Sequence, residues 1–375
     1  MHSPEIIQTS MLIDIIVGTR PNFMKAAAII HALNAAIAGG SKLEFRLIHT
    51  GQHYDEKMSA NFFNQLNIPL PDINFGVGSG TQAEQTALIM IRYEQLLMQY
   101  PSKICLVLGD VNSSMACAIV AQKLGVKVGH VEGGIRSGDW TMPEEINRLI
   151  VDSISNWFFT TSKYANENLK KLNIDPKRIF FVGNTMIDTL VSNMQKLTPP
   201  IFWDKCGLNA RKYMVLTLHR PSNVDRVEKL EKIIALIAES APLIPVVFPV
   251  HPRTSSQLKE ISNIPTNFIL VEPLPYLEFN FLVKNAVAVI TDSGGITEET
   301  TYMNIPCITM RPTTERPETV EIGTNILVGD GDSNELKNAL VELLEGGWKQ
   351  GAIPEKWDGN AGERIVLALE QIILE

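Results

Sequence analysis

Short apolar segments alternate with amphipathic segments along almost the whole of this 375-residue chain. The apolar segments are typical of buried strands, and the segments between them have the 3.6-residue spacing of helices. This alternation predicts an α/β fold whose parallel strands are covered by helices on both faces. In the first half the predicted strands are Leu12–Val17, Leu43–His49, Ile104–Leu108, Val126–Val131, Trp157–Thr160 and Ile179–Val182, and the predicted helices are Pro21–Ala38, Glu56–Leu66, Ser113–Leu124, Glu144–Ser155, Lys163–Leu172 and Thr185–Lys196.

A second set of such units follows a break at Leu197–Gly207, where Pro199 and Pro200 predict irregular backbone. Beyond the break the alternation resumes. The predicted strands there are Tyr213–Leu218, Ile244–Phe248, Phe268–Val271, Ala286–Ile290, Pro306–Thr309 and Ile326–Val328, and the predicted helices are Arg226–Ser240, Thr254–Ile261, Ile296–Met303, Ser333–Glu345 and Gly362–Leu374.

Two Rossmann-like domains are therefore predicted, and the length of the chain also favours two domains over one. We place the N-terminal domain at residues 1–196, joined by the C-terminal helix 360–375, and a nucleotide-binding C-terminal domain at residues 197–359. Ligands of parallel sheets bind at the carboxyl ends of the strands. The cleft between the two domains is thus the expected site.

Charge and cysteine content restrict the partners and the location of the chain. A net charge of −8 without a basic block argues against nucleic acid as the main partner. The sequence contains neither an apolar stretch of membrane-spanning length nor a recognisable signal peptide, so we expect a cytoplasmic protein without a membrane partner. The four cysteines lack zinc-site spacing and are predicted to be buried free thiols: Cys105, Cys117, Cys206 and Cys307.

The first predicted strand runs into Gly18–Pro21, a turn suited to binding phosphate. A helix begins at Pro21, and the exposed N–H groups and dipole of a helix start attract anions. Gly18 would allow the tight turn, and Arg20 and Lys25 add positive charge. The alternative is an ordinary strand–helix turn with both cationic side chains in solvent.

A similar turn, Thr291–Gly295, follows a strand of the second half. Ser293, Gly294 and Gly295 can cradle a phosphate through N–H and O–H donors. Glu299, on the helix that follows, can accept hydrogen bonds from a ribose diol. Finding two such turns favours phosphate binding at both.

The alternative for the second turn is purely structural. Asp292 or Ser293 would cap the helix, and Glu298 and Glu299 would lie on its solvent-facing side. Neither turn has the spacing of a Walker motif or of a dinucleotide-binding glycine pattern, so we expect no bound nicotinamide and no other cofactor.

Two carboxylates end predicted strands on the same rim of the first sheet. Asp110 follows Gly109 after one strand, and Glu132 follows the next strand. The glycines after Glu132, at positions 133 and 134, would let a ligand approach closely. Carboxylates at such a rim are suited to acid/base chemistry.

Glu144 is a third acidic candidate with a strong structural alternative. Thr141, Pro143 and Glu144 fit the capping box of a helix start, and Glu144 is also spaced to pair with Arg148. The sequence does not decide between a catalytic and a capping role.

Histidines follow two strands of the second half in equivalent places. His219 precedes Arg220, and His251 lies two residues before Arg253. Because each histidine has an arginine nearby, anion binding is favoured. No His pair or His/Cys cluster has the spacing of a metal site, so no metal is expected.

Together these motifs resemble the non-hydrolysing UDP-N-acetylglucosamine 2-epimerases, and the resemblance covers nearly the whole chain. The number, order and spacing of the motifs make it specific. They are GTRPNFMK, GQH at Gly51–His53, Gly109-Asp110, HVEGGIRSGD, MPEEINR, VGNTMIDTL, HRPSNVD, PVHPRT, TDSGGITEET and TTERPET. The position after GTRP, usually Glu in the family, is Asn22 here.

The resemblance implies a GT-B fold, a homodimer and the interconversion of UDP-GlcNAc and UDP-ManNAc without NAD. It implies anti elimination of UDP, a 2-acetamidoglucal intermediate, and re-addition of UDP after C2 is reprotonated on its other face. Matched by motif, the catalytic residues would be Asp110, Glu132, Glu144 and His219. Residues expected to bind the UDP-sugar are Arg20, Lys25, His219, Arg220, His251, Ser293, Gly294, Gly295, Glu299 and Arg316.

Three alternatives stay open at this point. A hydrolysing 2-epimerase would release ManNAc and UDP. A 2-epimerase of another UDP-acetamido sugar, such as a diacetamido uronic acid nucleotide, would need a further anion-binding group near C6. A GT-B glycosyltransferase would need an acceptor site. A non-catalytic nucleotide-sugar binder would need no catalytic residues, and the several carboxylates on one rim disfavour it.

Overall fold

The structure, a computed structural model, describes residues 11–51, 63–329 and 334–374. It divides into two compact units. Met1–Thr189 with Asp358–Glu375 forms the N-terminal unit, and Leu190–Trp357 forms the C-terminal unit. The predicted helix Glu56–Leu66 and the residues Gln52 and His53 lie largely or wholly outside the described residues.

The N-terminal unit contains a parallel sheet with the strand order β3-β2-β1-β4-β5-β6-β7. The order reverses between β1 and β4, and sheets of this kind usually bind ligands at the carboxyl ends of the strands beside such a reversal. The strands are β1 (Met11–Val17), β2 (Leu43–His49), β3 (Ile73–Asn74), β4 (Ile104–Leu108), β5 (Lys127–Val131), β6 (Trp157–Thr160) and β7 (Ile179–Phe181).

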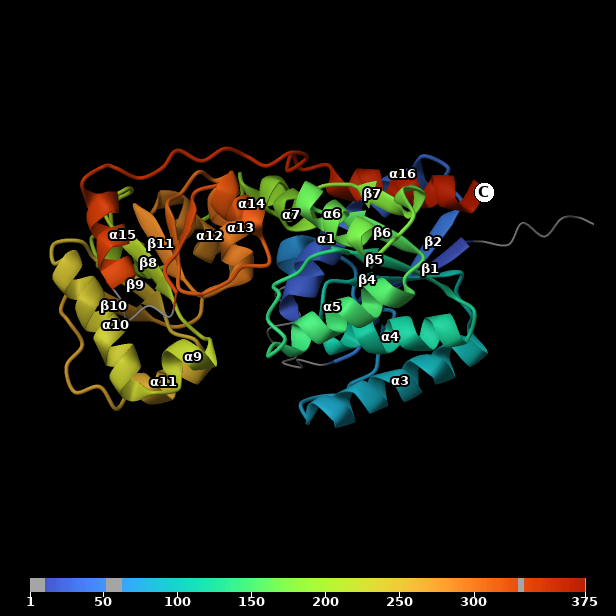
Figure 1. Ribbon diagram of the computed structural model, residues 1–375, viewed down its shortest axis with the longest axis horizontal. Helices are drawn as coiled ribbons and strands as arrows, with labels where there is room; N and C mark the ends of the chain where they lie inside the picture. The colour runs from blue at the N-terminus through green and yellow to red at the C-terminus, as the bar shows by residue number, and fades with distance from the viewer. Residues whose placement is uncertain (1–10, 52–62, 330–333, 375) are drawn as a thin grey trace, which may run out of the picture. The chain divides into compact units, whose positions relative to one another are not determined.

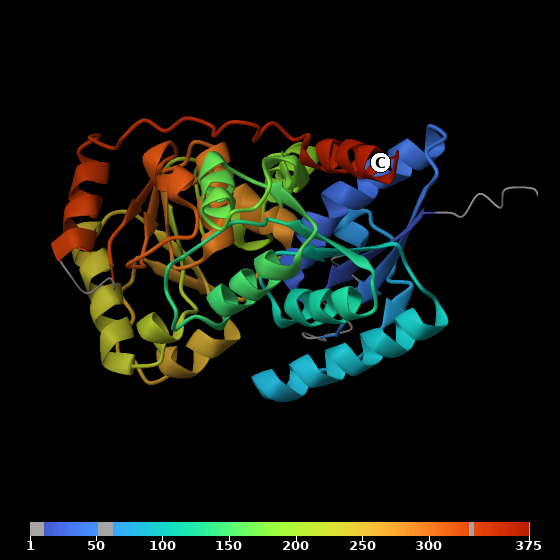
Figure 2. The ribbon, with the colours of Figure 1, turned by 45° about the vertical axis from the view of Figure 1, so that its right-hand side comes forward.

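Helices cover both faces of this sheet (Figures 1 and 2). Helices α3, α4 and α5 pack side by side on one face, and α1 packs against the C-terminal helix α16 on the other. The helices of the unit are α1 (Arg20–Ala38), α3 (Gln82–Gln99), α4 (Asn112–Lys123), α5 (Pro143–Ile154), α6 (Lys163–Lys171), the 3-10 turn η1 (Pro176–Arg178), α7 (Thr185–Asn193), which continues into the C-terminal unit, and α16 (Ala361–Leu374).

The C-terminal unit repeats this plan with the parallel strand order β10-β9-β8-β11-β12-β13. The reversal here lies between β8 and β11. The strands are β8 (Met214–Thr217), β9 (Val246–Pro249), β10 (Phe268–Val271), β11 (Ala288–Thr291), β12 (Cys307–Thr309) and β13 (Asn325–Leu327), and the helices are α8 (Phe202–Lys205), α9 (Pro221–Val224), α10 (Val227–Ser240), α11 (Pro252–Leu258), α12 (Tyr276–Asn285), α13 (Gly294–Tyr302), α14 (Pro317–Glu321) and α15 (Asn334–Leu344).

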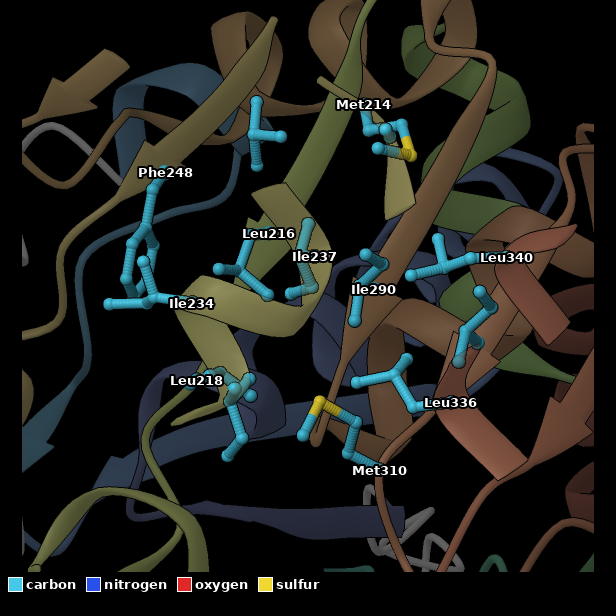
Figure 3. Close-up of a cluster of buried hydrophobic side chains, with 14 of the residues drawn as sticks. Met214, Leu216, Leu218, Ile234, Ile237, Phe248, Ile290, Met310, Leu336 and Leu340 are labelled. Atoms are coloured by element: carbon cyan, nitrogen blue, oxygen red, sulfur yellow. The ribbon is translucent and has the colours of Figure 1, made fainter. Parts of the chain in front are cut away.

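The core of the C-terminal unit fixes the central strands in place (Figure 3). Leu216 of β8 and Ile290 of β11 are completely buried between the side chains of α10 and α15. Burying such a side chain contributes about 1.5–3 kcal/mol, so this cluster holds rigidly the two strands whose ends carry the predicted site. The surrounding cluster includes Met214, Leu218, Ile234, Ile237, Phe248, Met310, Leu336 and Leu340.

Several sequence predictions need correction. Helices α3, α9, α12 and α14 were not predicted, and the short helix α8 lies inside Leu197–Gly207, where irregular backbone was expected. Three cysteines are buried free thiols, but Cys206 is exposed. Among the described residues, every helix is too short or too polar to cross a membrane.

Candidate active site

The turn after β1 differs from the predicted anion cradle, because Asn22 occupies it. The N–H groups of Gly18 and Thr19 both donate to Asn22 Oδ1 at 3.1 Å, and Asn22 Nδ2 donates to the carbonyl of Leu108 at 2.9 Å. Gly18 is needed for packing, since a Cβ there would lie 2.0 Å from Ser113 Oγ of α4. Positive charge at this turn therefore comes from side chains.

Arg20 and Lys25 supply that charge, and neither is simply a solvated side chain. Arg20 is half-buried, and burial lowers the pKa of its guanidinium. Lys25 is buried, and its Nζ lies 2.9 Å from Glu132 Oε2. The solvent-exposed alternative for these two residues is thus wrong.

Glu132 stands at the end of β5 in an unusual backbone conformation. Its φ is +69°, in the left-handed region that non-glycine residues rarely enter. Such a conformation costs on the order of 1–3 kcal/mol and tends to occur at functional sites. Its N–H donates to the carbonyl of Phe159 at 2.8 Å, and Lys25 holds its carboxylate, so the side chain has a fixed direction.

The glycines after Glu132 were predicted to let a ligand approach closely, but protein atoms already surround both of them. A Cβ on Gly133 would lie 3.0 Å from Phe158 Cδ1, and a Cβ on Gly134 would lie 2.3 Å from the carbonyl oxygen of Ala165. Both glycines therefore let the loop pack against β6 and α6.

Asp110 lies beside this pair at the end of β4. Its Oδ2 is 2.5 Å from an Nη of Arg148, and its carbonyl accepts a hydrogen bond of 2.8 Å from Asn147. Gly109, which precedes it with a φ of +64°, faces the Lys25–Glu132 pair, because a Cβ there would lie 2.8 Å from Lys25 Nζ. The ends of β4 and β5 thus bring both predicted carboxylates to one rim.

The predicted capping role of Glu144 is not what the structure shows. Helix α5 begins at Pro143, and its N-cap, Met142, makes no side-chain capping hydrogen bond. Arg148 instead pairs with Glu145 at 2.8 Å and with Asp110. Glu144, at the first turn of α5, is half-buried.

Glu145 has a structural role that the sequence did not reveal. It is buried, and its carboxylate accepts hydrogen bonds from the N–H groups of Ser137 and Gly138 as well as from Arg148. Glu145, Arg148 and Asp152 are buried at helical spacing on one side of α5. That polar stripe on an inward-facing side was the available sequence signal.

A buried hydrogen-bond network also holds the ends of β4 and β5 in place. His130 Nδ1 lies 2.6 Å from Asp152 Oδ1, and His130 Nε2 lies 3.0 Å from the carbonyl oxygen of Gly109. Burial opposes ionisation of Asp152, but the charges and hydrogen bonds of His130 and Arg136 outweigh it and lower the pKa of Asp152. His130 therefore ties α5 to the backbone that carries Asp110.

In the C-terminal unit, Asp292 connects the ends of the adjacent strands β8 and β11, which form the rim of that sheet. The sequence suggested only a capping role for it. It is completely buried at the end of β11 and accepts hydrogen bonds from the N–H groups of His219 and Arg220 and from the amide of Asn223. Its Oδ1 lies 2.8 Å from Nδ1 of His219. Asp292 thus orients both residues of the predicted His-Arg pair.

His251 lies next to His219, with their ring centroids 5.5 Å apart. Nδ1 of His251 accepts a hydrogen bond from the N–H of Arg253 and so caps α11. Burial and the neighbouring His219 lower the pKa of His251. The side chain of Arg253 pairs with Asp225, so the predicted anion-binding arginine next to His251 already has an internal carboxylate partner.

The turn before α13 places Ser293 as N-cap, with Gly294 and Gly295 in the first turn of the helix. Ser293 makes no side-chain capping hydrogen bond, which contradicts the capping alternative for this residue. Glu298 and Glu299 are both buried, so they do not lie on a solvent-facing side of the helix. Arg316 pairs with Glu298, with 2.5 Å between Nε and Oε1.

The carboxyl group of Glu299 is buried on α13. Burial raises its pKa to about 7, although the neighbouring side chains of Asn280 and Tyr276 act in the opposite direction. The Nδ2 of Asn280 lies 3.3 Å from Glu299 Oε1. Within residues 11–51, 63–329 and 334–374, no group of three His, Cys, Asp or Glu residues is arranged to hold a metal ion.

Known proteins are similar to this chain in both sequence and fold. The family model for UDP-N-acetylglucosamine 2-epimerase matches residues 35–370. A UDP-N-acetylglucosamine 2-epimerase of Methanocaldococcus jannaschii is 40% identical over 96% of this chain and 99% of the relative. A UDP-2,3-diacetamido-2,3-dideoxy-D-glucuronate 2-epimerase of Pseudomonas aeruginosa is 37% identical over 88% of this chain and 91% of the relative.

The crystal structure of the M. jannaschii enzyme in complex with UDP-GlcNAc and UDP is also similar, with a TM-score of 0.82 over 96% of this chain and 100% of that chain. The predicted fold class, two Rossmann-like domains of the GT-B type, is confirmed. The chain belongs to the UDP-N-acetylglucosamine 2-epimerase family.

Proposed function

We propose that this protein interconverts UDP-GlcNAc and UDP-ManNAc without releasing the free sugar. UDP leaves by anti elimination to give 2-acetamidoglucal, C2 is reprotonated on the opposite face, and UDP adds back. The observation that carries this proposal is the placement of Asp110 and the Lys25–Glu132 pair on one rim, at the ends of adjacent strands. Removing and returning the C2 proton requires two such groups.

The acid/base residues in this proposal are Asp110, Glu132 and Glu144. Asp110 and Glu132 are fixed in direction by Arg148 and Lys25 respectively. Held carboxylates keep their geometry while a proton is transferred, which is what general acid/base catalysis requires. For Glu144 the support is its position alone, a half-buried carboxylate in the first turn of α5.

The diphosphate of the same substrate is proposed to bind at the start of α13. Helix N–H groups at Gly294 and Gly295, the hydroxyl of Ser293 and the cationic side chains of the rim would stabilise the departing UDP. In this proposal His219 protonates or hydrogen-bonds the leaving phosphate, and Asp292 orients its ring. The further ligands would be Arg20, Lys25, Arg220, His251 and Arg316, and Glu299 would bind the ribose.

The experiment that tests this function is product analysis from both directions. UDP-GlcNAc and UDP-ManNAc should each be converted to the same equilibrium mixture, without net formation of free UDP or ManNAc. Irreversible accumulation of UDP and ManNAc would indicate the hydrolysing alternative.

A second substrate class is supported by the P. aeruginosa relative, which is named for a diacetamido glucuronate nucleotide. That substrate carries an additional carboxylate at C6, so a protein adapted to it would prefer it strongly over UDP-GlcNAc. Comparing kcat/KM for the two nucleotides decides between them.

We also propose that the protein works as a cytoplasmic homodimer. Leu88, Ile91 and Met98 are exposed apolar side chains spaced along one side of α3, and such a stripe is suited to contact with a second copy. Light scattering should give twice the mass of 41.6 kDa, and Ile91→Glu should shift it toward the monomer. A wild-type monomer would contradict this part of the proposal.

A further inference from the structure

A carboxylate of the chain itself occupies the start of helix α13. Oε1 of Glu315 lies 2.6 Å from the point where a Cβ on Gly294 would be. Gly294 is the first residue of the helix, and a helix N-terminus attracts negative charge. The carboxylate of Glu315 therefore lies at the helix start where the diphosphate is proposed to bind.

Arg311 holds Glu315 in this position. Its Nη2 lies 2.6 Å from Glu315 Oε2, and the two side chains are 3% and 13% exposed. The other terminal nitrogen, Nη1, lies 3.5 Å from the same point on Gly294 and has no hydrogen-bond partner among the described residues. A buried donor without a partner is costly, so its retention beside an anion-binding helix start points to a ligand.

We propose that Arg311 is a further ligand of the diphosphate and that Glu315 holds its place until the diphosphate binds. On binding, Arg311 exchanges the carboxylate for a phosphate oxygen, and Glu315 turns away from Gly294. Like charges cannot share the helix start, so the exchange is competitive. The identity of the ligand rests on the proposed function, but the exchange itself requires only diphosphate binding and no epimerisation.

Neutralising Glu315 should therefore strengthen diphosphate binding. Glu315→Gln removes the competing charge, and we expect it to bind UDP about tenfold more tightly, which corresponds to about 1.4 kcal/mol. Uridine lacks the diphosphate, so its affinity should not change. Arg311→Gln should weaken UDP binding about tenfold without affecting uridine, and should cancel the gain from Glu315→Gln in the double variant.

Isothermal titration of UDP, uridine and inorganic pyrophosphate into each protein tests the exchange. Glu231→Gln, an exposed position on α10, makes the same change in net charge and serves as the matched control. Thermal unfolding establishes that each variant is folded. If Arg311→Gln does not fold, Glu315→Gln decides alone.

The proposal is overturned if Glu315→Gln binds UDP with unchanged or lower affinity, or if uridine changes as much as UDP. It is also overturned if the wild type binds neither UDP nor pyrophosphate. A wild type that binds UDP and shows the exchange but does not epimerise UDP-GlcNAc would contradict the proposed function alone.

Discussion

Lys25 Nζ and Glu132 Oε2 lie 2.9 Å apart in a buried ion pair that joins the first helix to the end of β5. The pair lies against Gly109, where a Cβ would come within 2.8 Å of Lys25 Nζ and 3.7 Å of Glu132 Oε2. It therefore connects the loops after β1, β4 and β5, where the proposed acid/base residues lie.

Replacing Lys25 with Met should strongly destabilise the protein. Glu132 would keep a buried negative charge without its cation, and breaking a buried pair in this way costs about 3–5 kcal/mol. Urea unfolding measures the loss. The double variant Lys25→Met/Glu132→Gln should recover most of the stability but no activity. A loss below about 1 kcal/mol in the single variant would show that the pair is not energetically coupled.

The carboxylates of the rim should be needed for chemistry and not for nucleotide binding. Asp110→Asn and Glu132→Gln are each expected to lower kcat by about 10²- to 10⁴-fold, the usual contribution of acid/base catalysis. The affinity of Asp110→Asn for UDP should stay within about threefold of the wild type, because Asp110 is not a proposed UDP ligand. Glu132→Gln also removes the charge partner of Lys25, so only its kcat is interpreted, under conditions where thermal unfolding shows that it is folded. Glu44→Gln, at an exposed position of β2, is the control. Near-normal turnover in either variant would exclude that residue from proton transfer.

Asp292 should make the stability of the protein depend on pH in the acid range. Burial opposes its ionisation, but hydrogen bonds and charge from His219, with the Arg220 N–H and the Asn223 amide, outweigh burial and lower the pKa of Asp292. Because the folded pKa is lowered, Asp292 stabilises the fold above its ordinary pKa of about 4 and this contribution disappears as pH falls further.

The measurement is urea unfolding of the wild type and Asp292→Asn between pH 6 and pH 3. The variant should be clearly less stable at pH 6, and the difference should shrink toward pH 3. A difference that is constant over this range would mean that the charge of Asp292 contributes nothing.

Glu299 should make ribose binding depend on pH near neutrality. Its pKa is raised to about 7 by burial, so the folded protein holds this proton in the range where an unfolded chain has lost it. Stability from the protonated group therefore falls as pH rises toward 7. The ionised carboxylate is the better acceptor for the ribose hydroxyls, so uridine should bind more tightly at pH 8 than at pH 6.

Glu299→Gln should remove most of this pH dependence. Uridine is the suitable ligand because it carries no phosphate that titrates in the same range. Deoxyuridine, which lacks the 2′-hydroxyl, should show a weaker dependence in the wild type. Equal pH profiles for the wild type and Glu299→Gln would contradict the assigned role.

The sequence predicted the two parallel sheets because buried strands and amphipathic helices have distinct periodicities. It did not predict α3, although Thr81 and Glu84 form a capping box at its start. Five apolar residues in the middle of that helix, Ala87–Ile91, obscure its 3.6-residue pattern. Helix α12 was missed for a similar reason, since aromatic and apolar residues also fit a buried strand.

Candidate site residues could be predicted from the sequence where their place at the end of a strand is enough to suggest a catalytic or binding role. Asp110 and Glu132 end apolar strands, and that placement is visible in the sequence. The roles of Asp292 and Glu145 could not be predicted from the sequence, because they depend on hydrogen bonds to residues distant in the chain or across a loop. The sequence does not show that the side chain of Asn22 folds back and accepts hydrogen bonds from the N–H groups of Gly18 and Thr19, which an anion was expected to bind.

The most direct test of the central claim is NMR of the protein with UDP-GlcNAc in D2O. If the rim carboxylates remove and return the C2 proton, UDP-ManNAc should appear with deuterium at C2, and the recovered UDP-GlcNAc should also become deuterated there. UDP-ManNAc that retains its C2 hydrogen, or active protein with no exchange at C2, would contradict the account.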